Sequence, residues 1–467
     1  MKKISLIAIT VLFTLAPLSA SINLFRTSLP AQAGVNSVFV FDTWDYIVTP
    51  AFYSWQTDDT VSAVYTPDQY DRNTFVMGGR NTVGLPIYWA VGLKNERAKS
   101  QNYDTTNSSS LESTTGENRF RISLGTEIAG FGIGLFGEYL NNSTLYSNTT
   151  NGSTYTANAG LTNNTPNRIR AGVNLGQSID KKVVWSVGAA VRQNGGSYSF
   201  NNGTTTLEGV SSLTLTGGRL ARPQNTTDAE VSTFGWITLT ERGERAYWRG
   251  NFSYQLKGEV GVKQTTGATV TTATIDEDAN NGNLFLGYAM AWPLSETARF
   301  YFGPEVGVEY SSVKTFATNG ANGFTGSNLG FTANSQRLQE GNTTFAGKLN
   351  LPIVFQLPVV ANLLSLQAGW YPEITVYSVT QREQTNNIAT NPKVVDVEST
   401  RYLRANVEKY GAGLTYTPVN RLKIHLLFTT ITNDDPNVTA TDRVDISRVS
   451  VGVDYVFASD DGAKSGS

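Results

Sequence analysis

The sequence predicts an all-β protein, namely a transmembrane antiparallel up-and-down β-barrel of about fourteen strands, with sixteen strands as the alternative. Three observations support this prediction: an apolar N-terminal segment typical of export, a long series of segments in which apolar and polar residues alternate, and connections that are alternately short and long. Alternation with a period of two marks a strand with one apolar and one wet face. Short turns at one end and long loops at the other are typical of a membrane barrel.

The N-terminus has the layout of a secretory signal. "MKK" is a short cationic segment, and residues 4–18 form an apolar run that is too short to span a membrane as a helix. A signal peptide over residues 1–33 would end at the A-x-A sequence "AQA", before Gly34. Cleavage after Ala20 is the alternative, because it lies closer to the apolar run. We therefore expect export through the Sec pathway.

Composition narrows the class of protein. The chain has 467 residues, a net charge of −2 and no cysteine. Near-neutral charge gives no electrostatic reason to expect nucleic acid as a partner. The lack of cysteine excludes a disulfide scaffold, a thiol nucleophile and a lipid-modified N-terminal cysteine. Apart from the N-terminal run, no apolar stretch approaches the length of a spanning helix, so strands would have to cross any membrane.

Fourteen alternating segments begin at residue 83, and the barrel is expected over residues 83–457. The predicted strands are 83–94, 117–128, 131–140, 166–177, 182–200, 231–241, 246–264, 283–292, 297–313, 342–356, 363–379, 404–417, 421–433 and 445–457. Short connections such as 129–130 alternate without exception with long ones such as 141–165, which are rich in Asn, Thr, Ser and Gly. A soluble sandwich has no reason to place every long connection at one end, whereas a membrane barrel does.

Within the strands, residue types follow the two faces of a barrel wall. In residues 299–310, "RFYFGPEVGVEY", one set of alternate residues is apolar and the other, apart from Tyr301, is charged or glycine. Aromatic residues such as Tyr139 and Trp292 stand near strand ends, where barrels carry aromatic girdles. The prolines inside predicted strands, Pro304, Pro352 and Pro372, predict β-bulges because proline lacks the N–H that a ladder needs.

The last strand, "VSVGVDYVF", places apolar residues on one face and ends in Tyr455 and Phe457. It resembles the C-terminal β-signal of Gram-negative outer-membrane proteins. That resemblance implies contact with outer-membrane lipid, insertion by the barrel-assembly machinery, and a barrel-closing role for this strand. The usual motif is terminal, whereas residues 458–467 follow here and are expected to form a periplasmic tail.

Residues 34–82 precede the first predicted strand and are rich in aromatic residues. Fourteen strands, both ends in the periplasm and an N-terminal segment of this length resemble the FadL family of hydrophobic-compound channels. In that family the segment folds into the barrel as a hatch and often carries Asn-Pro-Ala. This chain has Thr49, Pro50 and Ala51, with Thr where Asn is usual. The resemblance implies a hatch that plugs the lumen; the alternative is two further strands in this region, giving a porin-like barrel.

Charged residues on the inward faces predict a site near the outer mouth. The predicted topology places them at similar height on three neighbouring strands: Arg119, Arg121, Glu138, Arg168 and Arg170. Clustered guanidinium groups favour anions, or the carboxylate head of an amphipathic solute. The alternative is that these arginines pair with Glu138 and other acids and stiffen the wall.

We therefore expect a channel for passive uptake of small solutes, hydrophobic or amphipathic ones included, narrowed by its N-terminal segment. The alternative is a surface structural or adhesion protein that uses the barrel as an anchor and its Asn/Thr-rich loops for contacts. An enzyme is not expected, because His425 is the only histidine and stands alone on its strand. No cofactor is implied. The acidic loop 276–282 departs from the calcium-binding pattern, so no metal is expected either.

Overall fold

The computed structural model describes residues 51, 59–66, 72–81, 85–104, 109–150, 165–197, 199–201, 205–208, 210–212, 222–223, 226–241, 244–258, 260–266, 269–294, 298–318, 336–360, 363–386, 394–419, 421–434 and 446–457. The predicted signal peptide, Thr49, Pro50 and the tail 458–467 lie outside the described residues.

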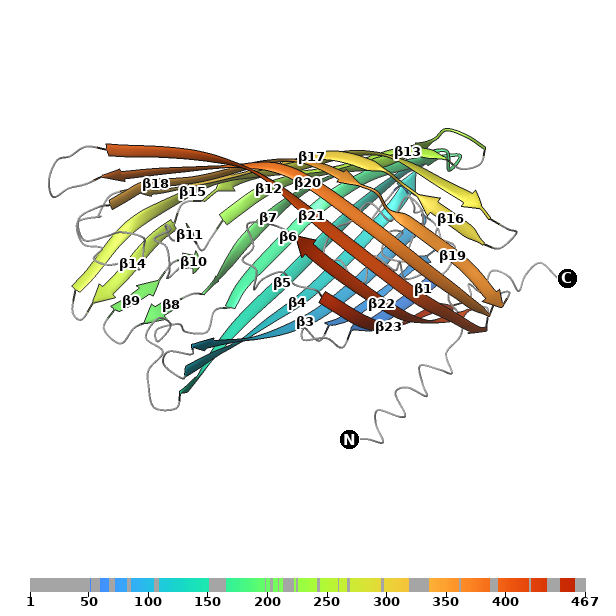
Figure 1. Ribbon diagram of the computed structural model, residues 1–467, viewed down its shortest axis with the longest axis horizontal. Coiled ribbons are helices and arrows are strands. Elements are labelled where there is room, and N and C mark those ends of the chain that lie inside the picture. The colour runs from blue at the N-terminus through green and yellow to red at the C-terminus, as the bar shows by residue number, and fades with distance from the viewer. Residues whose placement is uncertain are drawn as a thin grey trace.

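Long strands dominate the described chain (Figure 1). The wall strands are β1 Asp59–Thr66, β2 Arg72–Asn81, β3 Ile87–Asp104, β4 Ser109–Ile128, β5 Phe131–Thr150, β6 Thr165–Ile179, β7 Val183–Ser197, β12 Thr226–Thr238, β13 Arg245–Lys257, β14 Val260–Thr266, β15 Thr269–Pro293, β16 Arg299–Phe302, β17 Glu305–Thr318, β18 Gln336–Asn350, β19 Ile353–Val360, β20 Leu364–Asn386, β21 Val394–Val419, β22 Leu422–Asp434 and β23 Ile446–Phe457. Four short strands lie between β7 and β12: β8 Ser199–Asn201, β9 Thr205–Glu208, β10 Val210–Ser212 and β11 Arg222–Pro223.

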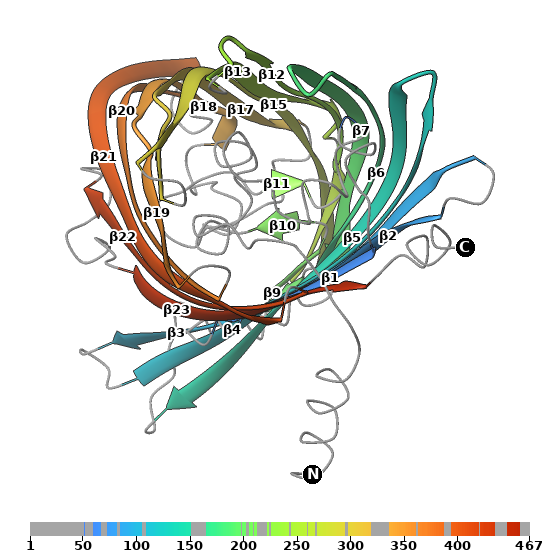
Figure 2. The same ribbon diagram turned by 90° about the vertical axis from the view of Figure 1, so that its right-hand side faces the viewer.

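The wall strands pair antiparallel in a closed ring (Figure 2). Around it run β1, β2, β3, β4, β5, β6, β7, β12, β13, β15, β17, β18, β20, β21, β22 and β23, and β23 pairs with β1. Strands β14, β16 and β19 continue the positions of β13, β17 and β18. The described wall therefore has sixteen positions, and the predicted all-β up-and-down barrel is confirmed.

The fourteen predicted strands are all present, and β1 and β2 supply the other two positions. The wall thus begins at Asp59 rather than at residue 83, as in the sixteen-strand alternative. Val61 and Ala63 of β1 are cross-strand partners of Tyr455 and Val453 of β23, so β1 closes the barrel against the last strand.

The outer surface of the wall is apolar and its inner surface is polar, the reverse of a soluble protein. In β17, Val306 is 56% exposed, whereas its neighbour Glu305 is 1% exposed. The same outward exposure is shared by many apolar side chains around the ring, among them Leu124, Leu135, Val173, Val231, Leu286, Phe345, Leu366 and Val451. Such an apolar surface suits lipid. The closed ring of described strands leaves no unpaired strand edge in the hydrocarbon. No helix of the described residues has the length and apolar character needed to cross a membrane.

Aromatic rings flank this apolar band. Near the end with the short connections, here called the turn end, Phe300 stacks on Trp292 at 5.3 Å between ring centroids and lies 4.8 Å from Phe355. Toward the opposite end, here called the mouth, Tyr139 and Tyr310 are exposed on the outer face. These are the two interface levels that the sequence predicts.

Prolines interrupt the wall, but not as the predicted bulges. The strand breaks at Pro304, between β16 and β17, and at Pro352, between β18 and β19, while Pro372 lies within continuous β20. Pairing between β18 and β20 stops at Asn350↔Glu373 and resumes in the same register at Ile353↔Trp370. Each proline removes one ladder hydrogen bond but inserts no residue. The carbonyl of each proline still accepts a hydrogen bond from a neighbouring strand: Tyr288 N to Pro304 O at 3.0 Å, Gly303 N to Pro352 O at 3.1 Å and Leu351 N to Pro372 O at 3.0 Å.

At the mouth, the wall continues well beyond a membrane. β20 has 23 residues and β21 has 26, whereas a tilted strand crosses the hydrocarbon with about 9–11. Much of the predicted loop 95–116 is likewise strand, since β3 ends at Asp104 and β4 starts at Ser109. Hairpin pairing satisfies the backbone of these polar segments outside the lipid.

Two short strands lie inside the ring. β10 and β11 pair with each other in the connection between β7 and β12, and Figure 2 shows them within the outline of the barrel. β10 contacts β7, and β11 contacts β15, three wall positions further round. These two strands, which belong to a connection predicted as an external loop, therefore lie over part of the lumen.

Candidate functional site in the lumen

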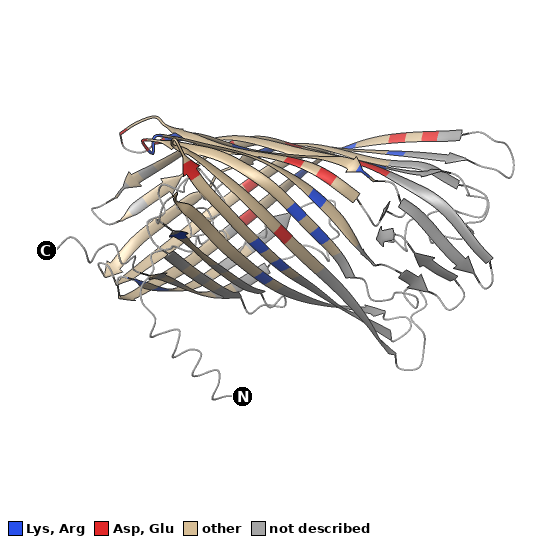
Figure 3. Ribbon diagram, turned by 180° about the vertical axis from the view of Figure 1, so that it is seen from behind, with Lys and Arg blue, Asp and Glu red and all other residues tan. Residues whose placement is uncertain are grey.

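Charged side chains meet on the inner wall because the strand register places them level. Arg121 of β4 is the cross-strand partner of Glu138 of β5, which is opposite Arg170 of β6. Arg170 is opposite Arg192 of β7, and Arg192 is opposite Asp228 of β12. These residues form a row across five strands at the level of outward-facing Tyr139, near the mouth. Figure 3 shows charged residues of both signs gathered on neighbouring strands of the wall.

Carboxylates in and beside this row are held by arginines. Arg192 donates from Nε (2.9 Å) and Nη2 (2.6 Å) to Asp228 Oδ2. Its Nη1 lies 2.9 Å from Glu230 Oε1, and Arg170 Nε donates to Glu230 Oε2 at 2.6 Å. Arg121 lies 3.8 Å from Glu138. Asp228 and Glu230 are buried, and charge-assisted bonds of this kind offset the cost of removing them from water.

An aromatic ring orients two of the arginines. The guanidinium carbons of Arg121 and Arg170 lie 4.4 and 4.9 Å from the centroid of the Phe136 ring. Phe136 in turn lies against Gly172, its cross-strand partner, where an added Cβ would come within 2.8 Å of the ring. Cation–π contact orients both guanidinium groups and so restricts the conformations that the charged side chains of the row can adopt.

Arg168 stands one step closer to the mouth. Its Nε donates to Asn194 Oδ1 at 2.9 Å, and Asn194 Nδ2 donates to Thr226 Oγ1 at 2.8 Å and to Asp228 Oδ2 at 3.2 Å. Within the described part of the chain, the two terminal nitrogens of Arg168 have no hydrogen-bond or ion-pair partner. Arg168 therefore differs from Arg170 and Arg192, which are bound to carboxylates.

All five residues predicted from the sequence (Arg119, Arg121, Glu138, Arg168 and Arg170) lie on strands β4, β5 and β6 with inward parity. The sequence reasoning missed Arg192, Asp228 and Glu230. Arg192 alternates with outward Val191, which was a usable signal. The two acids were assigned to a loop because the strand was predicted to start at residue 231, whereas β12 starts at Thr226.

A second cluster lies on the inner wall nearer the turn end. Arg249 of β13 binds Glu305 through Nε and Nη2, at 2.8 and 2.7 Å, and Asn350 Nδ2 donates to Glu305 at 2.7 Å. The Arg249 guanidinium carbon lies 3.8 Å from the centroid of the Phe285 ring. Both carboxylate oxygens are thus occupied by wall residues, so this cluster holds strands together.

Lys348 forms two ion pairs on the inner wall beside that cluster. Its Nζ lies 3.0 Å from Glu309 and 3.1 Å from Glu373, on the strands to either side of β18. His425 is also inward and buried, with its Nδ1 2.9 Å from Thr415 Oγ1. Among the described residues, no group of three or more His, Cys, Asp or Glu side chains is arranged to hold a metal ion.

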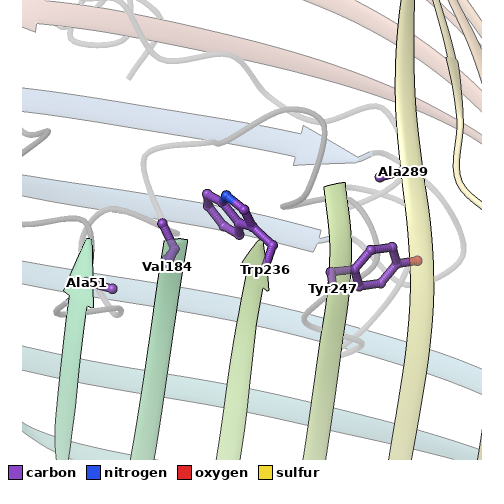
Figure 4. Close-up of a cluster of buried hydrophobic side chains, with 5 residues drawn as sticks. All are labelled: Ala51, Val184, Trp236, Tyr247 and Ala289. Atoms are coloured by element: carbon purple, nitrogen blue, oxygen red, sulfur yellow. The ribbon is translucent and has the colours of Figure 1, made fainter. Parts of the chain in front are cut away.

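Of the predicted hatch residues, the structure places only Ala51. It is buried in a cluster of inward-facing side chains on the wall (Figure 4): Val184, Trp236, Tyr247 and Ala289. A Cβ built on Gly176 of β6 would lie 2.7 Å from Ala51 N and 2.9 Å from Ala51 Cβ. Ala51 therefore lies directly against the inner face of β6, at a position where only glycine leaves room.

No protein-family model matches the chain, and no curated protein sequence is similar to it. Solved structures with a similar fold include a deltaS2 mutant of the TodX monoaromatic hydrocarbon channel (10% identity, 91% of this chain and 94% of that chain, TM-score 0.40). Others are the ferric yersiniabactin uptake receptor FyuA from Yersinia pestis (9%, 86% and 80%, TM-score 0.35) and the FrpB iron transporter from Neisseria meningitidis (7%, 90% and 83%, TM-score 0.36). These are distant resemblances, so function has to be argued from the wall and lumen of this chain.

Proposed function

We propose that the protein is an outer-membrane channel through which small solutes pass by diffusion. The observation that carries this proposal is the reversed distribution of side chains: apolar outward, and charged or polar toward the lumen on strands all round the ring. A polar inner wall inside a lipid-facing barrel suits an aqueous path. Sixteen wall positions enclose a lumen wider than wall side chains alone fill.

Two segments narrow that path. The β10–β11 pair folds into the ring from the mouth side, and Ala51 lies on the inner wall nearer the turn end. The two further strands β1 and β2 replace the fourteen-strand wall on which the FadL-like resemblance rested, so a hatch that includes Thr49, Pro50 and Ala51, with passage of hydrophobic or amphipathic solutes, is proposed from the place of Ala51 on the inner wall. The support for such a hatch comes from the contacts of Ala51, because Thr49 and Pro50 lie outside the described residues.

Osmotic swelling of proteoliposomes tests the channel. Three refolded proteins are compared in sugars of increasing size: the chain from Gly34, the chain from Asp58, and the chain with residues 209–224 replaced by a short Gly/Ser linker. Truncation stops at Asp58 because β1 is part of the wall. We expect swelling in the first protein, and faster swelling with a higher size limit in the other two. Equal rates in all three would exclude both segments as constrictions.

A second candidate is a surface protein for which the barrel is only an anchor. It is favoured by the long hairpin of β20 and β21, where Val397 is 56% and Tyr402 is 82% exposed. On this account none of the three proteins swells, and adhesion of cells to a surface or to one another depends on this hairpin. Swelling of the intact protein would reject it as the sole function.

A further inference from the structure

We propose that Arg168 forms a binding subsite for small carboxylate anions in the lumen wall near the mouth. The proposal rests on the proposed channel function and adds the class of solute that the wall recognises. It assigns a specific role to one arginine of the predicted group, whereas the others are engaged in the wall.

The first step concerns the carboxylates of the wall and the groups that bind them. Asp228 is bound by Arg192 and Asn194, and Glu230 is bound by Arg170 and Arg192. Glu138 lies beside Arg121 and is the cross-strand partner of Arg170. The acids near this row are therefore already engaged by other groups, and none of them satisfies Arg168.

The second step is the immediate neighbourhood of Arg168. Its cross-strand partners are neutral on both sides: Leu140 on β5 and Asn194 on β7. One step nearer the mouth, the register positions on these three strands hold Asn142, Pro166 and Gly196, which are also neutral residue types. An arginine between uncharged partners keeps its charge available to the lumen.

Other cations of this level differ in this respect. Lys94 and Arg119 are cross-strand partners on β3 and β4, and two residues nearer the mouth the register pairs Glu96 with Glu117. The backbone register thus places two acids next to those two cations. The corresponding register positions on β5, β6 and β7, one step nearer the mouth than Arg168, hold no acid.

The third step is the geometry of the free group. The bond from Nε to Asn194 anchors the guanidinium from one side, and the two terminal nitrogens remain as donors within the described chain. A planar pair of donors matches the two oxygens of a carboxylate, and matches a chloride ion less well. A small carboxylate that binds there competes with chloride for passage.

The test is the conductance of planar bilayers in potassium chloride, with potassium acetate added at constant ionic strength. We expect acetate to reduce the chloride current of the intact protein, and the Arg168→Gln variant to need about fivefold more acetate for the same reduction, the effect of one unit charge at about 4 Å in water. Arg168→Lys keeps the charge and loses the fork, so it should keep the preference for anions and lose the discrimination between acetate and chloride.

Arg382→Gln is the matched control. Arg382 is exposed on the outer part of β20, paired with Asp396, and remote from the row. Its loss should leave the acetate effect unchanged. Circular dichroism confirms that each variant holds its strand content before measurement.

The outcomes separate the subsite from the channel. Steady chloride conductance in the intact protein with no effect of acetate, or an effect that Arg168→Gln leaves unchanged, overturns the subsite and leaves the channel standing. Equal reduction of the current by phosphate would widen the class of ligand from carboxylates to oxyanions in general and so overturn the specific assignment. The absence of conductance in every variant would overturn both proposals.

Discussion

Glu305 shows how much one lumen side chain contributes to the wall. It is almost fully buried, and it accepts two bonds from Arg249 and one from Asn350, which join β13, β17 and β18. Glu305→Gln leaves Arg249 buried without its counter-charge, and removal of one partner from such a pair costs about 3–5 kcal/mol. We expect that loss in the free energy of unfolding, measured by urea titration of the barrel in lipid vesicles.

Glu309→Gln is the control for that prediction. The Glu309 side chain is a third exposed, and its partner Lys348 keeps Glu373. The loss should stay below about 1 kcal/mol. If both variants lost the same free energy of unfolding, the network around Glu305 would contribute no more to stability than the Lys348–Glu309 ion pair.

Aromatic rings of the inner wall lie on glycines of the next strand, which gives a second prediction for single residues. Gly307 is the cross-strand partner of Phe285, and a Cβ at Gly307 would come within 2.0 Å of that ring. Gly307→Ala should therefore destabilise the barrel by about 1–3 kcal/mol, since the ring has to move. Gly347→Ala, whose added Cβ meets nothing nearer than 3.9 Å, should change the same unfolding measurement by less than about 0.5 kcal/mol.

Among elements, the contact of Ala51 with β6 is open to a direct chemical test, because the chain contains no cysteine. In the double variant Ala51→Cys with Gly176→Cys, the two Cβ atoms start 2.9 Å apart, closer than the about 3.5–4.5 Å of a disulfide, so residue 51 has to move away from β6 by about 1 Å as the bond forms. We expect a disulfide to form during export and to change the mobility of the unreduced protein on a denaturing gel. The cross-link should also keep residue 51 against the wall during urea treatment that releases it in the reduced form.

Ala51→Cys with Gly452→Cys is the matched control. Gly452 lies on β23, six wall positions from β6, and a disulfide requires Cα atoms within about 7 Å. No cross-link is expected there. Cross-linking in both pairs would mean that Ala51 is not held against β6.

The sequence predicts some elements far better than others, for physical reasons. The strands from β3 onward carry regular alternation, because one face meets lipid and the other the lumen, and all of them are present. β1 and β2 are shorter, and the last four residues of β2 include Gly78 and Gly79, which dilutes the pattern. The β10–β11 pair has no lipid-facing side, so its sequence is as polar as that of an external loop.

The candidate site was predictable only in part. Arg168 and Arg170 stand in a strongly alternating strand, so their inward face could be read from neighbours such as Ile169. Asp228 and Glu230 alternate with Ala229 and Val231, but they follow a polar connection that hides the start of β12. Which arginine binds which acid depends on the register between strands, and no single strand encodes that.

For the molecule as a whole, the apolar band sets where the lipid lies, and two valines with equal exposure test it. Val306 and Val397 are each 56% exposed, but Val306 faces outward between the aromatic levels of Phe300 and Tyr310, whereas Val397 lies far out on β21, level with Glu383 and with the parity of the inner face. Val306→Arg should reduce the folding free energy in vesicles by about 2–4 kcal/mol. Val397→Arg should change it by less than about 0.5 kcal/mol. Similar losses of folding free energy at both sites would show that the apolar band does not mark where the lipid lies.

The measurement that tests the central claim most directly is the single-channel conductance of the intact protein in planar bilayers. A sixteen-position barrel with a polar, partly narrowed lumen predicts discrete, steady conductance steps that grow in proportion to salt concentration. Bilayers that stay silent, although the protein is inserted and its mouth hairpins are accessible to protease, would contradict a channel and leave the barrel as an anchor for its outer hairpins.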